Sequence, residues 1–254
     1  MIRTDITAAT HIAQKILAFR PSALRPFVIG LPTGSTPVGT YNHLIQLHKT
    51  KKLSFEHIYT FNMDEYVGLG KGQPESFYET MRELLFKHID IPEQNINILN
   101  GKASSFVEEC SRYERKIRSL GGIHLFVGGV GVYGHLAFNE PGEPGTSFDS
   151  RTRRVALSQV TIKANARFFS DNEAQVPRKA LTVGLATIME AKEIMLLAAG
   201  LQKAPVIKKI IEEQPSDLVP ASIVKKHQKS LLVCDLDAAS LVRKSIGHDS
   251  IDND

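Results

Sequence analysis

Apolar runs of strand length alternate along this chain with segments of helical spacing, and this alternation limits the folds open to it. Five runs have the length and apolar content of buried strands: residues 27–31, 58–61, 123–127, 193–199 and 230–234. Four segments between or after them have helical spacing: residues 38–47, 106–120, 203–212 and 221–227. Parallel strands need long crossover connections, which helices supply. The pattern predicts a three-layer α/β fold, with a mostly parallel sheet covered by helices on both faces.

The composition is that of an ordinary globular protein. The chain has 254 residues, of which 42% are hydrophobic and 23% charged, and this balance excludes the disordered and collagen-like classes. The formal net charge of +4 is mild and evenly spread, so it predicts no nucleic-acid partner, although an anionic substrate remains compatible. We expect a single domain over residues 1–254, with a frayed tail at 248–254.

The cysteines and the N-terminus together predict where the protein works. Cys110 and Cys234 lie far apart and neither has a CxxC partner, which favours buried thiols in a reducing compartment over a disulfide. The first residues lack the charged and apolar regions of a signal peptide, and no stretch reaches about 18 apolar residues. We therefore expect a cytoplasmic protein with no membrane partner.

The turns after the predicted strands carry the functional information, because ligands of parallel α/β sheets bind outside the carboxyl ends of the strands. Five such turns stand out: residues 31–37, 62–66, 128–135, 199–203 and 234–237. Residues 142–178 contain Pro, Gly, Ser and Asn with weak periodicity. Long segments of this kind often cover a site, so we expect this one to be a lid.

The first of these turns has the residue types of an anion site. Thr33, Gly34, Ser35 and Thr36 place small side chains, hydroxyls and free backbone N–H groups before a predicted helix, where the helix dipole also favours a phosphate. The alternative is that a Ser or Thr here simply caps the helix. Lys203 stands in a corresponding place and would add a cation, or else is merely solvated.

The third turn contains a GxGxxG pattern at Gly129, Gly131 and Gly134. This pattern raises dinucleotide binding as a rival function. However, Pro141 and Pro144 interrupt the helix that should follow it. We therefore interpret the glycines as a turn whose backbone approaches a small ligand, and expect no cofactor.

Three acidic residues and one histidine are the candidates for acid and base chemistry. Asp64 and Glu65 follow a strand, and adjacent side chains of an extended backbone point in different directions. One can face the ligand as a general base while the other makes a structural bond. The spacing of His135 and Glu140 lets a carboxylate orient an imidazole. Neither HExxH nor paired cysteines occur, so no metal is expected.

Several of these segments together resemble the glucosamine-6-phosphate deaminase family. The matching stretches are LPTGSTP at 31–37, FNMDEYVGL at 61–69, GGVG with GHLAFNEP at 128–141, RFF at 167–169 and ALTVG at 180–184. They occur in order between residues 27 and 235. The resemblance implies a three-layer fold of the sugar-phosphate isomerase type.

The resemblance also implies a reaction, the conversion of D-glucosamine 6-phosphate to D-fructose 6-phosphate and ammonia without a cofactor. Asp64 matches the family's base, which moves the C2 proton of the open-chain sugar. His135 matches the ring-opening residue, and Glu140 matches the carboxylate that orients it. The phosphate cradle is matched by residues 33–36, Arg167 and Lys203. The resemblance leaves open a homo-oligomer.

Two departures from the family pattern keep alternatives open. Tyr133 stands where the family has an acidic residue before Gly134 and His135, so a slower enzyme, a sugar-phosphate lactonase or isomerase of the same fold, or a non-catalytic amino-sugar-phosphate sensor remain candidates. In the segment that binds the activator N-acetylglucosamine 6-phosphate in some members, Arg153 is retained but Val155 replaces a lysine. We therefore expect little activation.

Overall fold

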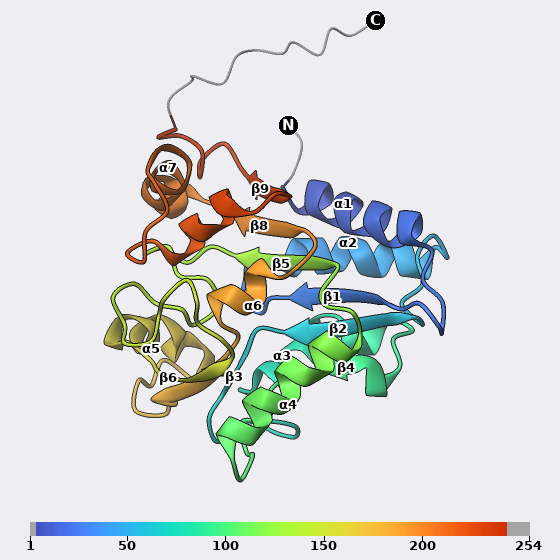
Figure 1. The fold of residues 1–254 in the computed structure, drawn as a ribbon, viewed down its shortest axis with the longest axis horizontal. Coiled ribbons are helices and arrows are strands. Elements are labelled where there is room, and N and C mark those ends of the chain that lie inside the picture. Colours follow the sequence, from blue (N-terminus) through green and yellow to red (C-terminus); the bar gives the residue numbers. More distant parts are fainter. Residues whose placement is uncertain (1–3, 243–254) are drawn as a thin grey trace, which may run out of the picture.

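Six strands form one fully parallel sheet in the structure, a computed structural model that describes residues 4–242. The strand order across this sheet is β4 (Ile96–Asn97), β2 (Ile58–Asn62), β1 (Phe27–Leu31), β5 (Leu125–Gly129), β8 (Ile194–Ala198) and β9 (Ser230–Cys234) (Figure 1). The five strands predicted from the sequence are all present. The predicted frayed tail at 248–254 lies outside the described residues.

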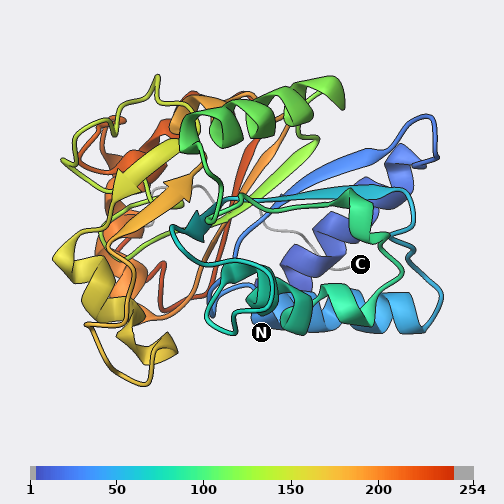
Figure 2. The ribbon, with the colours of Figure 1, turned by 90° about the horizontal axis from the view of Figure 1, so that it is seen from below.

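Helices cover both faces of this sheet. Side chains alternate between the faces of a strand, and these strands are apolar on both faces, so each face needs a covering layer. On β1, Phe27 and Ile29 belong to one apolar cluster and Val28 to another. The first cluster includes residues of α1 (Thr4–Phe19), α2 (Val38–Lys49) and α3 (Phe77–Leu84); the second includes residues of α4 (Phe106–Ser119), α6 (Leu185–Met189) and α7 (Ala204–Glu212). Figure 2 shows α4 on one side of the sheet and α1 and α2 on the other. The predicted three-layer α/β fold is confirmed.

Local sequence explains where α4 begins and which face it buries. The Ser105 hydroxyl accepts a hydrogen bond from the Glu108 N–H at 3.3 Å and so caps the helix. Cys110, Tyr113 and Ile117 follow at helical spacing and are buried against the sheet. Cys110 and Cys234 are both free thiols, as predicted, but only Cys110 is buried, whereas Cys234 is partly exposed.

A second, antiparallel sheet of three strands was not predicted. Its order is β3 (Asp64–Tyr66), β7 (Lys179–Thr182) and β6 (Arg153–Ala156). With α5 (Gln159–Asn165) it encloses an apolar cluster separate from the two beside the large sheet. The predicted lid, residues 142–178, therefore contains β6, α5 and the 3-10 helix η3 (Ala166–Phe168). Figure 2 shows this part at one end of the molecule.

The remaining elements are short. The helix predicted at 221–227 is the 3-10 helix η5 (Pro220–Lys226), in which Ser222 N–H donates to the Val219 carbonyl at 2.7 Å. The other 3-10 turns are η1 (Phe86–His88), η2 (Glu93–Asn95) and η4 (Leu201–Lys203). Within residues 4–242, no helix has the length and apolar character needed to span a membrane, and no three potential metal ligands lie together.

Candidate active site

A cavity of about 1000 Å³ opens at the carboxyl ends of the central strands. It brings together predicted site residues from the turns after β1, β2 and β5 and from η3: Thr33, Gly34, Ser35, Asp64, His135 and Arg167. Four other predicted residues, Thr36, Tyr133, Glu140 and Lys203, do not line this cavity. The turns that sequence analysis selected therefore meet at one place, although not every residue in them faces it.

Asp64 and Glu65 have separate environments because they alternate along β3. The Glu65 carboxylate accepts hydrogen bonds from the N–H groups of Phe77 and Tyr78, both at 3.0 Å, and from that of Tyr66 at 2.9 Å. It therefore satisfies the start of α3. Asp64 instead lines the cavity and is 7% exposed. One carboxylate is structural and the other faces the ligand space, as expected for adjacent residues.

The environment of Asp64 favours proton exchange near neutral pH. Burial, together with the negative charge of Glu65, raises the pKa of Asp64 to about 8. No hydrogen bond to its carboxylate is present among the described residues that would offset the loss of water. A carboxylate with such a pKa is a far stronger base than an ordinary aspartate, and this property suits proton abstraction.

The turn after β5 is shaped around the His135 ring. A Cβ atom added at Gly131 would lie 2.2 Å from the Cε1 and Nε2 atoms of His135, so only glycine fits beneath the imidazole. The Gly131 N–H also donates to the His135 carbonyl at 2.9 Å. No helix follows the GxGxxG pattern. Gly131 therefore makes room for a side chain of the site, while Gly129 of the same turn lines the cavity, where a ligand can approach its backbone.

His135 is held in its neutral form by its surroundings. Burial lowers its pKa and the nearby positive charge of Lys203 lowers it further, while the charge of Glu140 opposes both. Glu140 is 6% exposed, and its Oε1 atom has no hydrogen-bond partner within the described part of the chain. Glu140 thus acts on the imidazole through its charge from outside the cavity lining. A neutral imidazole can accept or relay a proton.

Asn139 anchors the turn that carries His135 and Glu140, and sequence reasoning missed this role. Its buried amide donates to the carbonyls of Leu136 and Val183, both at 2.8 Å, and its Oδ1 atom accepts from Arg153 Nη1 at 2.9 Å. These bonds attach the turn to β6 and to the residue that follows β7. The only sequence signal was its place beside Glu140 in the motif of 134–141.

Arg153 is engaged inside the protein. Besides Asn139, its guanidinium donates to Thr146 Oγ1 at 3.3 Å, and a Cβ added at Gly145 would lie 3.5 Å from its Nε atom. Burial lowers its pKa, and the described residues place no carboxylate within ion-pair distance of it. The 142–147 stretch therefore packs over the one basic side chain that the sequence retained in this segment.

The turn at residues 33–36 leaves the start of α2 uncapped. The residue at the N-cap position is Pro37, and no side chain of the described protein caps the helix there. Gly34 has a φ of +90°, a conformation that glycine adopts without strain. The simpler interpretation, in which a hydroxyl of this turn caps α2, is therefore not what the structure contains. The turn therefore leaves N–H groups at the start of a helix, where the helix dipole favours an anion.

Two cations that are distant in sequence lie near one another: Arg167 lines the cavity, and Lys203 is close enough to feel its charge. Lys203 is half-buried at the start of α7; burial lowers its pKa and the charge of Arg167 lowers it further. The turn of Lys203 is held by Asp235, whose carboxylate accepts from the Gly200 N–H at 2.9 Å. Two neighbouring positive charges are stabilised by an anion placed between them.

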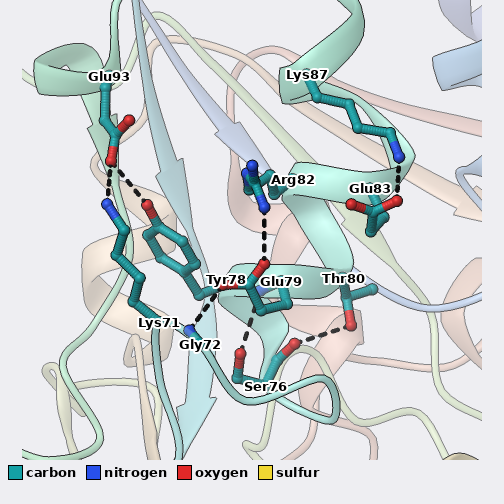
Figure 3. Close-up of polar contacts among 10 residues, drawn as sticks. All are labelled: Lys71, Gly72, Ser76, Tyr78, Glu79, Thr80, Arg82, Glu83, Lys87 and Glu93. Carbon is teal, nitrogen blue, oxygen red and sulfur yellow. Dashed lines mark hydrogen bonds and ion pairs between the residues drawn. The ribbon is translucent and has the colours of Figure 1, made fainter.

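The outer wall of the cavity comes from α3 and the loop before it, which sequence reasoning did not identify. Glu79 accepts hydrogen bonds from the Gly72 N–H at 2.8 Å and from Arg82 Nη1 at 3.4 Å (Figure 3). Lys71 pairs with Glu93 at 2.5 Å. These bonds fix the loop around residue 72, which lines the cavity. The wall depends on contacts between side chains that no motif marks.

Tyr133 lies in the same turn as His135 but makes no contact with the cavity. Its side chain is 60% exposed, and no hydrogen bond joins it to His135 in the described structure. The hydrogen bond that a phenol at this position could offer the imidazole is therefore not formed. The His135 ring is positioned instead by its packing over Gly131 and by the nearby charge of Glu140.

The fold and cavity define a class: a three-layer α/β protein with its ligand cavity at the carboxyl edge of a parallel sheet. Within that class, the chain belongs to the family of glucosamine-6-phosphate isomerases and 6-phosphogluconolactonases, whose sequence model matches residues 4–233. It is 51% identical over 228 residues to glucosamine-6-phosphate deaminase of Yersinia pseudotuberculosis serotype O:1b (strain IP 31758), covering 90% of this chain and 85% of that protein.

Further relatives and solved structures are similar to this chain. Glucosamine-6-phosphate deaminase of Borreliella burgdorferi (strain ZS7) is 49% identical over 231 residues, covering 91% of this chain and 85% of that protein. A solved structure of a monomeric glucosamine-6-phosphate deaminase is 42% identical, with a TM-score of 0.88 over 94% of this chain and 95% of that one. A 6-phosphogluconolactonase from Thermotoga maritima, 21% identical, shares the fold with a TM-score of 0.68 over 89% of this chain and 94% of that one.

Proposed function

We propose that this protein converts D-glucosamine 6-phosphate and water to D-fructose 6-phosphate and ammonia. The observation that carries the proposal is Asp64, a buried carboxylate with a pKa of about 8 that lines the same cavity as His135 and the turn at residues 33–36. A base, a neutral imidazole and an anion site in one cavity match the needs of an amino-sugar phosphate. The deaminase relatives support this choice of substrate.

Binding begins with the phosphate in this proposal. The free N–H groups and hydroxyls of residues 33–36 receive it, and Arg167 and Lys203 supply positive charge. His135 then relays a proton between the anomeric hydroxyl and the ring oxygen, which opens the sugar ring. Glu140 stabilises the imidazolium that forms during this relay. Ring opening produces the C1 aldehyde that makes the C2 proton acidic.

Asp64 carries out the central proton transfer. Its carboxylate takes the C2 proton, the electron pair forms an enolamine between C2 and C1, and protonation at C1 gives a ketimine at C2. Water adds to this ketimine, the C–N bond breaks and ammonia leaves, so the oxygen of the ketone comes from water. The sum is an isomerisation joined to a hydrolytic deamination. Each step uses protons that the cavity side chains and water supply.

The proposed setting is amino-sugar breakdown in the cytoplasm, including the use of N-acetylglucosamine after its deacetylation. The free thiols of Cys110 and Cys234 suit a reducing compartment. The reaction as written uses no metal and no organic cofactor.

A product assay in metal-free buffer tests the proposed function. We expect ammonia and fructose 6-phosphate in equal amounts from glucosamine 6-phosphate, and no hydrolysis of 6-phosphogluconolactone above background. Lactone hydrolysis without ammonia would support the lactonase alternative. Binding of glucosamine 6-phosphate without any product would support the sensor alternative.

Replacing Tyr133 with Asp tests whether the family's missing acid matters here. We expect Tyr133→Asp to raise turnover by less than about tenfold, because a carboxylate at an exposed position is screened by water. We also expect the pKa of His135, which burial lowers, to move upward in this variant, because an added anion favours the protonated imidazole. Rates and pH profiles are compared with those of Tyr133→Phe as control. If both variants match the wild type, Glu140 alone suffices to orient His135.

Activation by N-acetylglucosamine 6-phosphate is expected to be absent or slight. Arg153 is occupied by Asn139 and Thr146, and Val155 supplies no cation. Steady-state rates measured with and without this compound should follow one hyperbolic curve. A sigmoidal curve that the compound turns hyperbolic is the result that contradicts this expectation.

A further inference from the structure

The fifth turn selected from the sequence, residues 234–237, places no residue in the cavity lining. It begins at the last residue of β9, which pairs in parallel with β8 along all five of its residues. The turn after β8, residues 199–203, carries Lys203. The two turns therefore leave the sheet side by side, and contacts between them bear on this phosphate-binding candidate.

The turn that carries Lys203 has little to hold it in place by itself. Its internal hydrogen bond runs from the Lys203 N–H to the Gly200 carbonyl at 2.9 Å, and no side chain of the described protein caps η4 or the start of α7. Gly200 has a φ of +89°, and Leu201 and Gln202 are exposed, so the turn buries little apolar surface. The position of Lys203 therefore depends on contacts from outside the turn.

Asp235 supplies such contacts. Its Oδ2 atom accepts a hydrogen bond from the Gly200 N–H at 2.9 Å, and its Oδ1 atom accepts from the same N–H at 3.1 Å. The Oδ1 atom also accepts from the Ala238 N–H at 2.8 Å, and Ala238 is fully buried. Hydrogen bonds from N–H groups to a carboxylate are stronger than bonds between neutral groups. The carboxylate thus joins the turn of Lys203 to a buried residue that follows β9.

These bonds act on the turn and are not needed to pair the strands. Every residue of β9 already has its partner on β8, and Asp235 lies one residue beyond the pairing. Among the described residues its carboxylate makes no ion pair with Lys203, since its partners are backbone N–H groups. Asp235 therefore affects where the turn lies and leaves the ammonium group free for another anion.

The position of this ammonium group matters because a second cation lies near it. The charge of Arg167 is close enough to lower the pKa of Lys203. Like charges repel, and the lysine stem is long and flexible, so the two groups tend to move apart when no anion lies between them. A main chain that is fixed at residue 203 limits this separation.

We propose that Asp235 is a positioning residue of the phosphate site, because it fixes the turn at residues 199–203 and so holds the Lys203 ammonium group beside Arg167. This inference rests on the proposed function, which assigns these two cations to the substrate phosphate. A turn that is fixed before the ligand arrives loses less freedom on binding, and this raises affinity. Asp235 acts through Lys203 and takes no part in the proton transfers.

The test is a double-mutant cycle of Asp235→Ala and Lys203→Ala. Affinity is measured by calorimetry with 2-amino-2-deoxyglucitol 6-phosphate, an open-chain analogue that has no aldehyde and cannot react. We expect Asp235→Ala to bind it about 3- to 10-fold more weakly, and KM for glucosamine 6-phosphate to rise by the same factor while kcat changes less than twofold. Beside Lys203→Ala the same change should have no effect, because the side chain through which Asp235 acts is then absent.

Two further variants separate positioning from general effects. Asp235→Asn keeps one oxygen that can accept from both N–H groups, so we expect a loss of only about 2- to 3-fold. If Asp235→Ala does not fold, the cycle is run with Asp235→Asn, whose smaller loss should also vanish beside Lys203→Ala. Asp237→Ala is the matched control, since it removes the same charge from an exposed side chain of the same turn. It should bind like the wild type.

Wild-type affinity in a folded Asp235→Ala, or in Asp235→Asn if only that variant folds, overturns the proposal. A loss that persists in full beside Lys203→Ala also overturns it, because Asp235 then acts by a route other than Lys203. A wild type that binds the analogue but releases no ammonia overturns the proposed function, while the cycle still decides the role of Asp235.

Discussion

Asp64→Asn is expected to lower ammonia release by roughly 10²- to 10⁴-fold, the range that a positioned general base contributes. The amide has nearly the shape of the carboxylate but cannot take the C2 proton. Because the phosphate cradle is untouched, we expect calorimetry to find substrate affinity within a few-fold of the wild type. The loss should therefore appear in kcat.

Glu114→Gln is the control for Asp64→Asn. Glu114 is also a buried carboxylate, but it lies on α4 and accepts a hydrogen bond from Thr152 Oγ1 at 2.6 Å, away from the cavity lining. Its replacement should leave kcat near the wild-type value at a temperature where the variant is folded. Turnover by Asp64→Asn at the wild-type rate would remove Asp64 from the reaction.

Asp64→Asn is also expected to stabilise the protein. The pKa of Asp64 is about 8 in the folded chain and near 3.8 without its surroundings, so between these pH values the folded state retains a proton that the unfolded chain releases. The free energy of unfolding therefore falls as pH rises through this window. Asp64→Asn has no such loss, so at pH 8 it should be more stable by about 2–4 kcal/mol. Urea unfolding at pH 5 and pH 8 measures the free energy of unfolding of both proteins. If this free energy changes by the same amount between the two pH values in wild type and Asp64→Asn, the burial argument is contradicted.

The pH profile follows from the same group. Only ionised Asp64 can accept the proton, so kcat/KM of the wild type should rise with pH, reach half of its plateau near pH 8 and level off above about pH 9. In the complex, the positive amino group of the substrate lowers the pKa of Asp64, because it stabilises the carboxylate. The rise of kcat with pH should therefore occur at lower pH than the rise of kcat/KM. A kcat/KM that is constant between pH 5 and pH 9 would show that Asp64 does not titrate in this range.

The second large effect concerns the two cations of the phosphate cradle. Arg167→Ala and Lys203→Ala are each expected to raise KM by about 10- to 150-fold, which corresponds to a loss of roughly 1.5–3 kcal/mol for a charge-assisted hydrogen bond. Because the phosphate is distant from the reacting carbons, kcat should fall less than KM rises. Initial rates over a wide substrate range separate the two constants.

Each of these variants has a matched control in its own helical segment. Lys208→Ala removes a half-buried cation of α7 that pairs with Glu212 at 2.6 Å, and Lys163→Ala removes an exposed cation of α5. Neither residue belongs to the proposed phosphate cradle, so KM should change less than twofold. An unchanged KM in both Arg167→Ala and Lys203→Ala would exclude these residues from the site.

Much of the large sheet could be predicted because its strands are short apolar runs between helices, a pattern that is local in sequence. The small sheet could not, because β3 has only residues 64–66 and Asp64 pairs with Thr182 far along the chain. No local periodicity records such a pairing. The segment 142–178 looked irregular for the same reason, since its order comes from β7 and from an apolar cluster shared with Tyr66.

The site was predictable where function depends on residue type and position after a strand, as for Asp64, His135 and the turn at 33–36. Roles that depend on packing were not predictable. Gly131 fits under an imidazole and Asn139 anchors a turn only once β5 and β7 are neighbours of that turn. The exposure of Tyr133 likewise depends on the backbone conformation of the turn. The sequence shows that a tyrosine replaces the family's acidic residue at position 133, but it does not show that this side chain points away from the His135 ring.

The most direct test of the account is the exchange of the C2 hydrogen. Glucosamine 6-phosphate carrying deuterium at C2 is incubated with wild type and with Asp64→Asn, and deuterium loss is followed by NMR together with ammonia release. We predict that the wild type removes the C2 deuterium as ammonia appears and that Asp64→Asn does neither while still binding the sugar phosphate. Removal of the C2 deuterium by Asp64→Asn at the wild-type rate, or ammonia release with the C2 deuterium retained at C2, would contradict the account.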